Sequence, residues 1–150
     1  MPNREVHART GAVAGVAYAG YHAWKQPRPV VVAEAAGGLI GGIVGGLLPD
    51  WIDTPDSPHH RAEAHSMGIT GTVGYLLKQQ LPAWQAALRE KAHHYGELQS
   101  ASPTPLHQLG YGILELLFRL LSGFFAGVLA GYASHLALDS LTPSALPILC

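Results

Sequence analysis

The stretch that decides the fold is VVVAEAAGGLIGGIVGGLL, which runs from Val30 to Leu48. Its only charged residue is Glu34, near one end. Its glycines form two rows with a spacing of four: Gly37, Gly41 and Gly45, and Gly38, Gly42 and Gly46. Such spacing removes side chains from a helix face and lets a neighbouring backbone approach closely. The stretch therefore predicts a closely packed apolar helix.

A second apolar stretch, from Leu106 to about Leu141, repeats this spacing at Gly123, Gly127 and Gly131. Val30 to Leu48 is just long enough to cross a ~30 Å hydrocarbon layer, and Glu34 could then reach the interface. Close packing in a compact soluble bundle uses the same glycine spacing, so both environments stay open. The spacing also allows a homo-oligomer. Glu115 and Arg119 lie one helical turn apart and can pair, facing protein or water.

The rest of the chain predicts further helices and no strand, because no alternating apolar pattern is present. Pro49 is expected to end the second helix, since proline disfavours helical geometry in the residue before it. We expect one domain over residues 1–150, an all-α compact bundle of about four to five helices. The expected order is a helix Val6–Trp24, a break Lys25–Pro29, a helix Val30–Leu48, a loop Pro49–Pro58, a helix His60–Gln80, a short amphipathic helix Pro82–His94, a polar linker Gly96–Pro105 and a helix Leu106–Leu141.

Composition narrows the class of protein. Only 13% of the residues are charged, about half the usual share, and the mean hydropathy is +0.16, where soluble and membrane proteins overlap. The formal charge of −1 provides no basic surface for nucleic acid. The lone cysteine, Cys150, excludes an internal disulfide. The amino terminus lacks the pattern of a secretory signal, so we expect no cleaved leader.

All four aspartates of the chain lie near histidines in the sequence. His135 and Asp139 are four residues apart in a helical stretch, so both can reach one ion from the same helix face. Asp50 and Asp53 precede His60 and His65. Imidazole and carboxylate together suit divalent metals such as zinc, with manganese or magnesium as alternatives.

The spacing of these residues leaves alternatives open. His60 and His65 differ by about 140° around an ideal helix, so one of them should lie at a helix start or in the loop. The aspartates in the Pro-rich loop could instead form turns and helix caps. His7 is a further candidate ligand near the start of the first helix. The remaining histidines are interpreted as solvated, with His59 as a substitute for His60: His22, His59, His93, His94 and His107.

Three ordered motifs resemble a known family. They are Leu48-Pro49-Asp50-x-x-Asp53, His60-Arg61-x-x-x-His65-Ser66, and Gly131-Tyr132-x-Ser134-His135-x-x-x-Asp139-x-Leu141-Thr142-Pro143. These strings look like the membrane-bound metal-dependent hydrolases of the YdjM type, also described as LexA-binding, inner-membrane-associated hydrolases. That family is distantly similar to zinc-dependent phospholipase C and related nucleases. The resemblance implies inner-membrane association, a repressor contact, and the metal ligands Asp50, His60, His65, His135 and Asp139, together with His7 and Asp53.

Seven potential ligands exceed the four of a closed zinc site, which favours one or two ions and hydrolysis of a phosphoester, which could be linked to lipid. Asp53 could bridge two ions or act as the base. Arg61 could clamp the phosphate, or it could simply pair with Asp56 or Glu63. No nucleophile motif for serine or cysteine catalysis is present.

Two other classes of protein remain open. One is a membrane scaffold or regulator in which the metal is purely structural. The other is a hydrophobic assembly or pore subunit built on the Gly-spaced helices. An open coordination position would favour the hydrolase over the scaffold, whereas oligomers that survive chelation would favour the assembly.

Overall fold

The structure is a computed structural model that describes residues 3–52 and 67–141. The described residues form four helices and contain no strand: α1 (Arg4–Ala23), α2 (Arg28–Ile52), α3 (Met67–Ala101) and α4 (Pro105–Ser140). This confirms the all-α prediction. The first and last helices begin and end within two residues of the predicted bounds.

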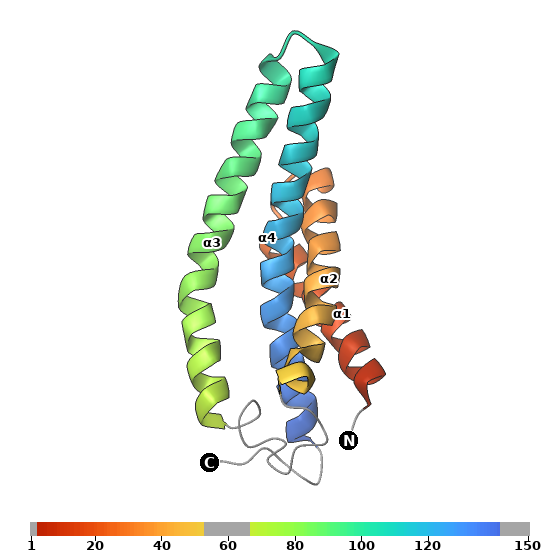
Figure 1. Cartoon of the computed structure of the whole chain (residues 1–150), viewed down its shortest axis with the longest axis vertical. Helices are drawn as coiled ribbons and strands as arrows, with labels where there is room; N and C mark the ends of the chain where they lie inside the picture. Colours follow the sequence, from red (N-terminus) through yellow and green to blue (C-terminus); the bar gives the residue numbers. More distant parts are fainter. Residues whose placement is uncertain (1–2, 53–66, 142–150) are drawn as a thin grey trace.

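The helices form an elongated bundle with α4 at its centre (Figure 1). α1, α2 and α4 all pack against one another, whereas, among the four described helices, the backbone of α3 approaches only that of α4. α3 and α4 form a long hairpin whose tip extends beyond the other two helices (Figure 1). The start of α1 lies at the same end of the bundle as the last turns of α2 and α4 (Figure 1). That end brings together residues from both ends of the chain.

Glycine lets α2 approach both of its neighbours. A Cβ on Gly42 would lie well inside van der Waals contact with the carbonyl oxygen of Gly11 in α1. A Cβ on Gly41 would meet the carbonyl oxygen of Phe124 in α4 in the same way. Because the obstructing atoms are backbone atoms, no side-chain movement could relieve the clash. The predicted close approach is confirmed, and these contacts lie within one chain.

Two predicted helix ends were wrong because proline does not interrupt either helix. α2 continues through Pro49 to Ile52, and α3 continues through Pro82, so the separate helix predicted from that residue does not exist. Proline already holds a helical φ and removes one backbone donor. Pro49 is fully buried, and Leu81 beside Pro82 is also buried, so packing holds both helices together across their prolines.

The predicted polar linker was also wrong, since most of it is helical. α3 extends to Ala101, and the Ser100 hydroxyl donates a hydrogen bond of 3.0 Å to the Gly96 carbonyl. α4 then starts at Pro105, where a missing backbone donor costs nothing. The hairpin connection is therefore very short, and it places α3 antiparallel beside α4 (Figure 1).

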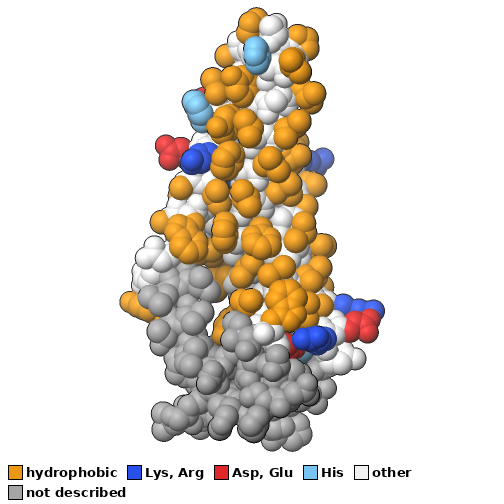
Figure 2. All heavy atoms as spheres, viewed as in Figure 1, with side chains coloured by type: hydrophobic (Ala, Val, Ile, Leu, Met, Phe, Trp, Pro, Cys, Tyr) orange, Lys and Arg blue, Asp and Glu red, His pale blue; other side chains and the backbone are white. Residues whose placement is uncertain are grey.

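Within the part of the chain that the structure describes, two helices are long and apolar enough to cross a membrane: Arg28–Trp51 in α2 and Pro105–Ser140 in α4. Large apolar side chains remain exposed on both, among them Ile40 and Leu117. Figure 2 shows apolar side chains covering most of the described part of one face of the bundle. A continuous apolar surface of this kind suits contact with lipid.

Candidate metal centre

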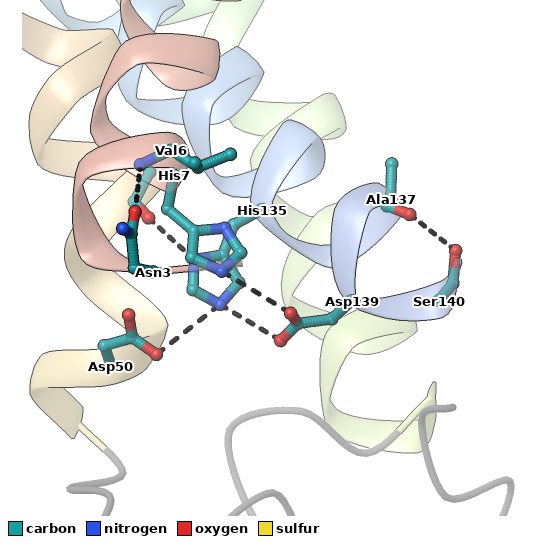
Figure 3. A network of polar contacts seen from close by, with 9 residues as sticks. Asn3, Val6, His7, Asp50, His135, Ala137, Asp139 and Ser140 are labelled. Atoms are coloured by element: carbon teal, nitrogen blue, oxygen red, sulfur yellow. Dashed lines mark hydrogen bonds and ion pairs between the residues drawn. The ribbon is translucent and has the colours of Figure 1, made fainter. Parts of the chain in front are cut away.

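Four candidate ligands meet at one end of the bundle (Figure 3). His7 lies in the second turn of α1, Asp50 in the last turn of α2, and His135 and Asp139 near the end of α4. The sequence predicted that Asp50 lies in a loop. The helix instead continues past Pro49, so Asp50 is a residue of α2. His7, His135 and Asp139 are at most 2% exposed. Residues from opposite ends of the chain thus share one buried site.

The side chains lie at short, similar distances from one another. The two carboxylate oxygens of Asp139 approach different histidines: Oδ1 is 3.5 Å from Nε2 of His7, and Oδ2 is 3.3 Å from Nε2 of His135. The same nitrogen of His135 is 3.7 Å from Oδ1 of Asp50. The two imidazole rings stack, with centroids 3.8 Å apart and planes inclined by 19°.

A backbone contact fixes the orientation of His135. Its Nδ1 lies 2.6 Å from the carbonyl oxygen of Gly46 in α2. Because a carbonyl can only accept, Nδ1 must carry the proton and donate it. In the neutral ring, the other nitrogen, Nε2, then presents a lone pair toward the carboxylates, as a metal ligand requires. This role of Gly46 was not predicted from the sequence, although its place in the glycine row signals a close helix contact.

The surroundings of His7 favour its neutral form. Burial lowers the pKa of His7, and a charge on the stacked His135 would lower it further, while Asp139 and Asp50 act in the opposite direction. Stacking also disfavours charging both rings at once, since like charges would then lie in contact. A neutral imidazole is the form that binds metal.

The distances fit the ligand shell of a metal ion. In a tetrahedral zinc site with bonds of about 2.0–2.1 Å, neighbouring ligand atoms lie about 3.3–3.4 Å apart. The nitrogen–oxygen distances of 3.3 and 3.5 Å are close to that value. Ligand atoms of His7, His135 and Asp139 all lie within 4.8 Å of one another. This His/Asp triad could therefore bind a divalent ion.

The structure brings together only part of the predicted set. His7, Asp50, His135 and Asp139 converge, whereas Asp53, His60, Arg61 and His65 lie outside the described residues, as do Asp56, His59 and Glu63. The histidines predicted to be solvated are exposed wherever the structure describes them: His22, His93, His94 and His107.

One acidic residue of α2 has a partner that the sequence did not predict. Glu34 is fully buried in the bundle and forms an ion pair with Arg89 of α3. Nε of Arg89 donates to Oε1 of Glu34 at 2.9 Å, and the second carboxylate oxygen accepts from Nη2. The predicted pair of Glu115 and Arg119 is confirmed, with 3.5 Å between Nη2 and Oε1.

The fold and the site define a helical membrane protein with a buried histidine–aspartate centre between three helices. Comparison with family models then gives the family: the YdjM inner membrane protein model matches residues 1–150. The chain therefore belongs to the YdjM inner membrane protein family, as the resemblance of its motifs implied. No curated protein and no solved structure matches it.

Proposed function

We propose that this protein is a metal-dependent hydrolase of the inner membrane that cleaves a phosphoester. The observation that carries the proposal is the convergence of His7, His135 and Asp139, whose ligand atoms lie within 4.8 Å although they come from opposite ends of the chain. The mixed nitrogen and oxygen donors suit zinc best, with manganese or magnesium as alternatives. A divalent cation bound there would supply Lewis acidity and make a bound water more acidic.

In the proposed function, different residues of the chain would bind the ion and the phosphate. His7 and His135 would ligate through Nε2, with His135 held by the Gly46 carbonyl. Asp139 faces both histidines and would hold the ion between α1 and α4. In the proposal, Asp53, His60 and His65 complete a one- or two-ion site, and Arg61 binds the phosphate through its planar guanidinium. An apolar protein surface would bring a lipid-linked phosphoester within reach.

A second candidate function is favoured by the burial of the same ligands. His7, His135 and Asp139 are at most 2% exposed, which suits a structural ion that staples three helices together. In that case the protein would be a membrane scaffold or regulator, and the repressor contact implied by the family resemblance would be its function.

Elemental analysis and an activity assay together test the proposal. Protein purified in mild detergent should hold one or two divalent ions per chain, lose them on exhaustive chelation, and hydrolyse at least one member of a phosphodiester panel when reloaded. His135→Ala should lose both the ion and the activity. His22→Ala, an exposed histidine of α1, is the matched control and should keep both. An ion without hydrolysis would support the structural function, and absence of any ion would overturn both.

A further inference from the structure

A second buried polar cluster lies far from the metal centre. It consists of the Glu34–Arg89 ion pair between α2 and α3 and the Glu115–Arg119 pair within α4, and Arg89 and Arg119 line one cavity. Arg119 and His135 are sixteen residues apart in α4, and a rise of 1.5 Å per residue separates them by about 24 Å. Glu34 and Asp50 are separated by the same number of residues in α2. The two clusters therefore occupy opposite ends of the closely packed helices.

The two arginines of this cluster are used differently. Arg89 is engaged by both carboxylate oxygens of Glu34, so its fork is already committed. Arg119 is only 8% exposed, yet its hydrogen bond to the Glu115 carboxylate is long, at 3.5 Å. Its Nε has no hydrogen-bond acceptor among the described residues. A buried guanidinium donor normally has an acceptor, so Arg119 is suited to one that comes from a ligand.

Arg119 also borders two neighbouring open cavities, one between α3 and α4 and the other formed by α3, Arg119 and Gln26. One has a volume of about 550 Å³ and the other about 520 Å³. His93, Glu97 and Arg119 line both, which makes the two cavities adjacent. Volumes of this size suit small-molecule ligands or lipid headgroups.

The charges around the cavities point to a ligand with charges of both signs. Arg119 offers donors to an anion. Glu97 offers a carboxylate at both cavities, Glu90 at one, and Glu115, which already pairs with Arg119, at the other. The Glu97 side chain is 66% exposed, and its described ion-pair partner is His93 at 3.5 Å. A simple anion would be repelled by these acids, whereas a phosphate that also carries an ammonium group would satisfy both signs.

The level of this cluster in the membrane agrees with such a ligand. The separation of about 24 Å from the metal centre is close to the ~30 Å thickness of the hydrocarbon layer. When α2 and α4 cross the bilayer, the two clusters lie toward opposite faces. The α3 segment around the cavities carries Arg89, Glu90, Lys91, His93 and Glu97, a charged sequence that belongs at headgroup level rather than among acyl chains.

We propose that the Arg119 cavities bind a phosphate ester bearing a primary amine, with the phosphate on the Arg119 guanidinium and the ammonium on Glu97. The ligand is either the headgroup of a zwitterionic phospholipid or a soluble phosphate ester of the same chemistry. This site is independent of the proposed metal centre, so its failure would leave the proposed hydrolase untouched.

Two binding assays on the intact, detergent-purified protein test this site and its source of ligand. Native mass spectrometry compares adducts of phosphatidylethanolamine and phosphatidylglycerol with identical acyl chains. Calorimetry measures soluble glycerophosphoethanolamine against glycerophosphate. The amine-bearing ligand should bind more tightly than the amine-free one in at least one assay. The assay in which it does so shows whether the ligand is a lipid or a soluble ester. Equal binding of amine-bearing and amine-free ligands in both assays, or no binding in either, would overturn the proposal.

Variants separate the two recognition groups. Arg119→Gln should weaken binding of the amine-bearing ligand about 10-fold, the loss of roughly one charged hydrogen bond. Arg9→Gln is the matched control, because Arg9 also pairs with a glutamate four residues away but lies exposed on α1. Glu97→Gln, an exposed change that spares the fold, should abolish the preference for the amine while leaving binding of glycerophosphate or phosphatidylglycerol intact. His135→Ala should change neither. A preference that survives both Arg119→Gln and Glu97→Gln would contradict the assignment.

Discussion

The two buried polar clusters share α2 and α4 but balance charge in different ways. One cluster contains Glu34, Arg89, Glu115 and Arg119 and is called the Glu34 cluster. In it, both carboxylate oxygens of Glu34 accept hydrogen bonds from the guanidinium of Arg89. In the other cluster, Asp139 faces imidazole nitrogens at distances of 3.3 and 3.5 Å, which suit shared ligation better than hydrogen bonding. The Glu34 cluster contains its own cation, the Arg89 guanidinium, and this ion pair joins α3 to α2. In the proposed function, the second cluster takes a divalent cation from solution.

The largest effect is expected when the Glu34 cluster loses its cation. Arg89→Met would leave the fully buried Glu34 carboxylate without its guanidinium, which costs about 3–5 kcal/mol of the free energy of unfolding. Unfolding in mixed micelles, followed by circular dichroism, measures this loss. The double variant Arg89→Met with Glu34→Leu should recover most of the stability, because no buried charge remains. A double variant as unstable as the single one would contradict the ion-pair interpretation.

A smaller effect should rank the two aspartates of the metal centre. Asp139 faces both histidines, whereas Asp50 lies 3.7 Å from one. We expect Asp139→Asn to weaken metal affinity at least about 100-fold and Asp50→Asn about 10-fold, the values at the two ends of the range for groups that support a metal. Competition with a coloured chelator measures both affinities. Equal losses would mean that Asp50 ligates as directly as Asp139.

Glycine packing links the fold to the metal centre and gives a third prediction. Gly42→Ala would push α1 from α2, because the added Cβ meets backbone atoms of Gly11 and Gly15. Overpacking of this kind costs about 1–3 kcal/mol of the free energy of unfolding, and it should also weaken metal binding by moving His7. Thermal unfolding and metal titration measure the two effects.

The control for this change is Gly20→Ala. A Cβ at Gly20 meets nothing within 4 Å, and alanine favours a helix over glycine by up to about 1 kcal/mol. The control should therefore be neutral or slightly stabilising. If Gly42→Ala behaved in the same way, the glycine rows would not set the distance between the helices.

The sequence predicted local features well and long-range contacts poorly. The helical spacing of His135 and Asp139 is a local property, and both residues indeed lie on one face of α4. The bounds of α1 and α4 were predicted to within two residues, although the cap Asn3, whose side chain accepts from the Val6 amide, was not singled out. The two prolines misled the prediction, because burial of neighbouring residues, which no local pattern reports, keeps α2 and α3 helical.

The candidate ligands converge through contacts between helices, and the sequence indicated these contacts only indirectly. His7 was a candidate near one end of the chain, but its approach to His135 requires α1, α2 and α4 to pack closely through glycine. The pair of Glu34 and Arg89 spans 55 residues and joins two helices whose relative register no motif specifies. That Glu34 is buried and that Arg89 reaches it could be recognised only after the helices were placed.

The smallest expected effect is the coupling between a change in the Glu34 cluster and a change in the metal centre, measured in the free energy of unfolding, which should be close to zero. Arg89→Lys keeps the charge beside Glu34 but loses the fork, so the protein should still fold, and Asp139→Asn weakens the metal centre. The clusters are about 24 Å apart along the helices and share no described partner, so the two changes in unfolding free energy should add to within about 0.5 kcal/mol. Unfolding of metal-loaded single and double variants in mixed micelles measures the coupling. A coupling well above that value would mean that α2 or α4 transmits strain between the clusters, and the two polar ends of the bundle would then act as one unit.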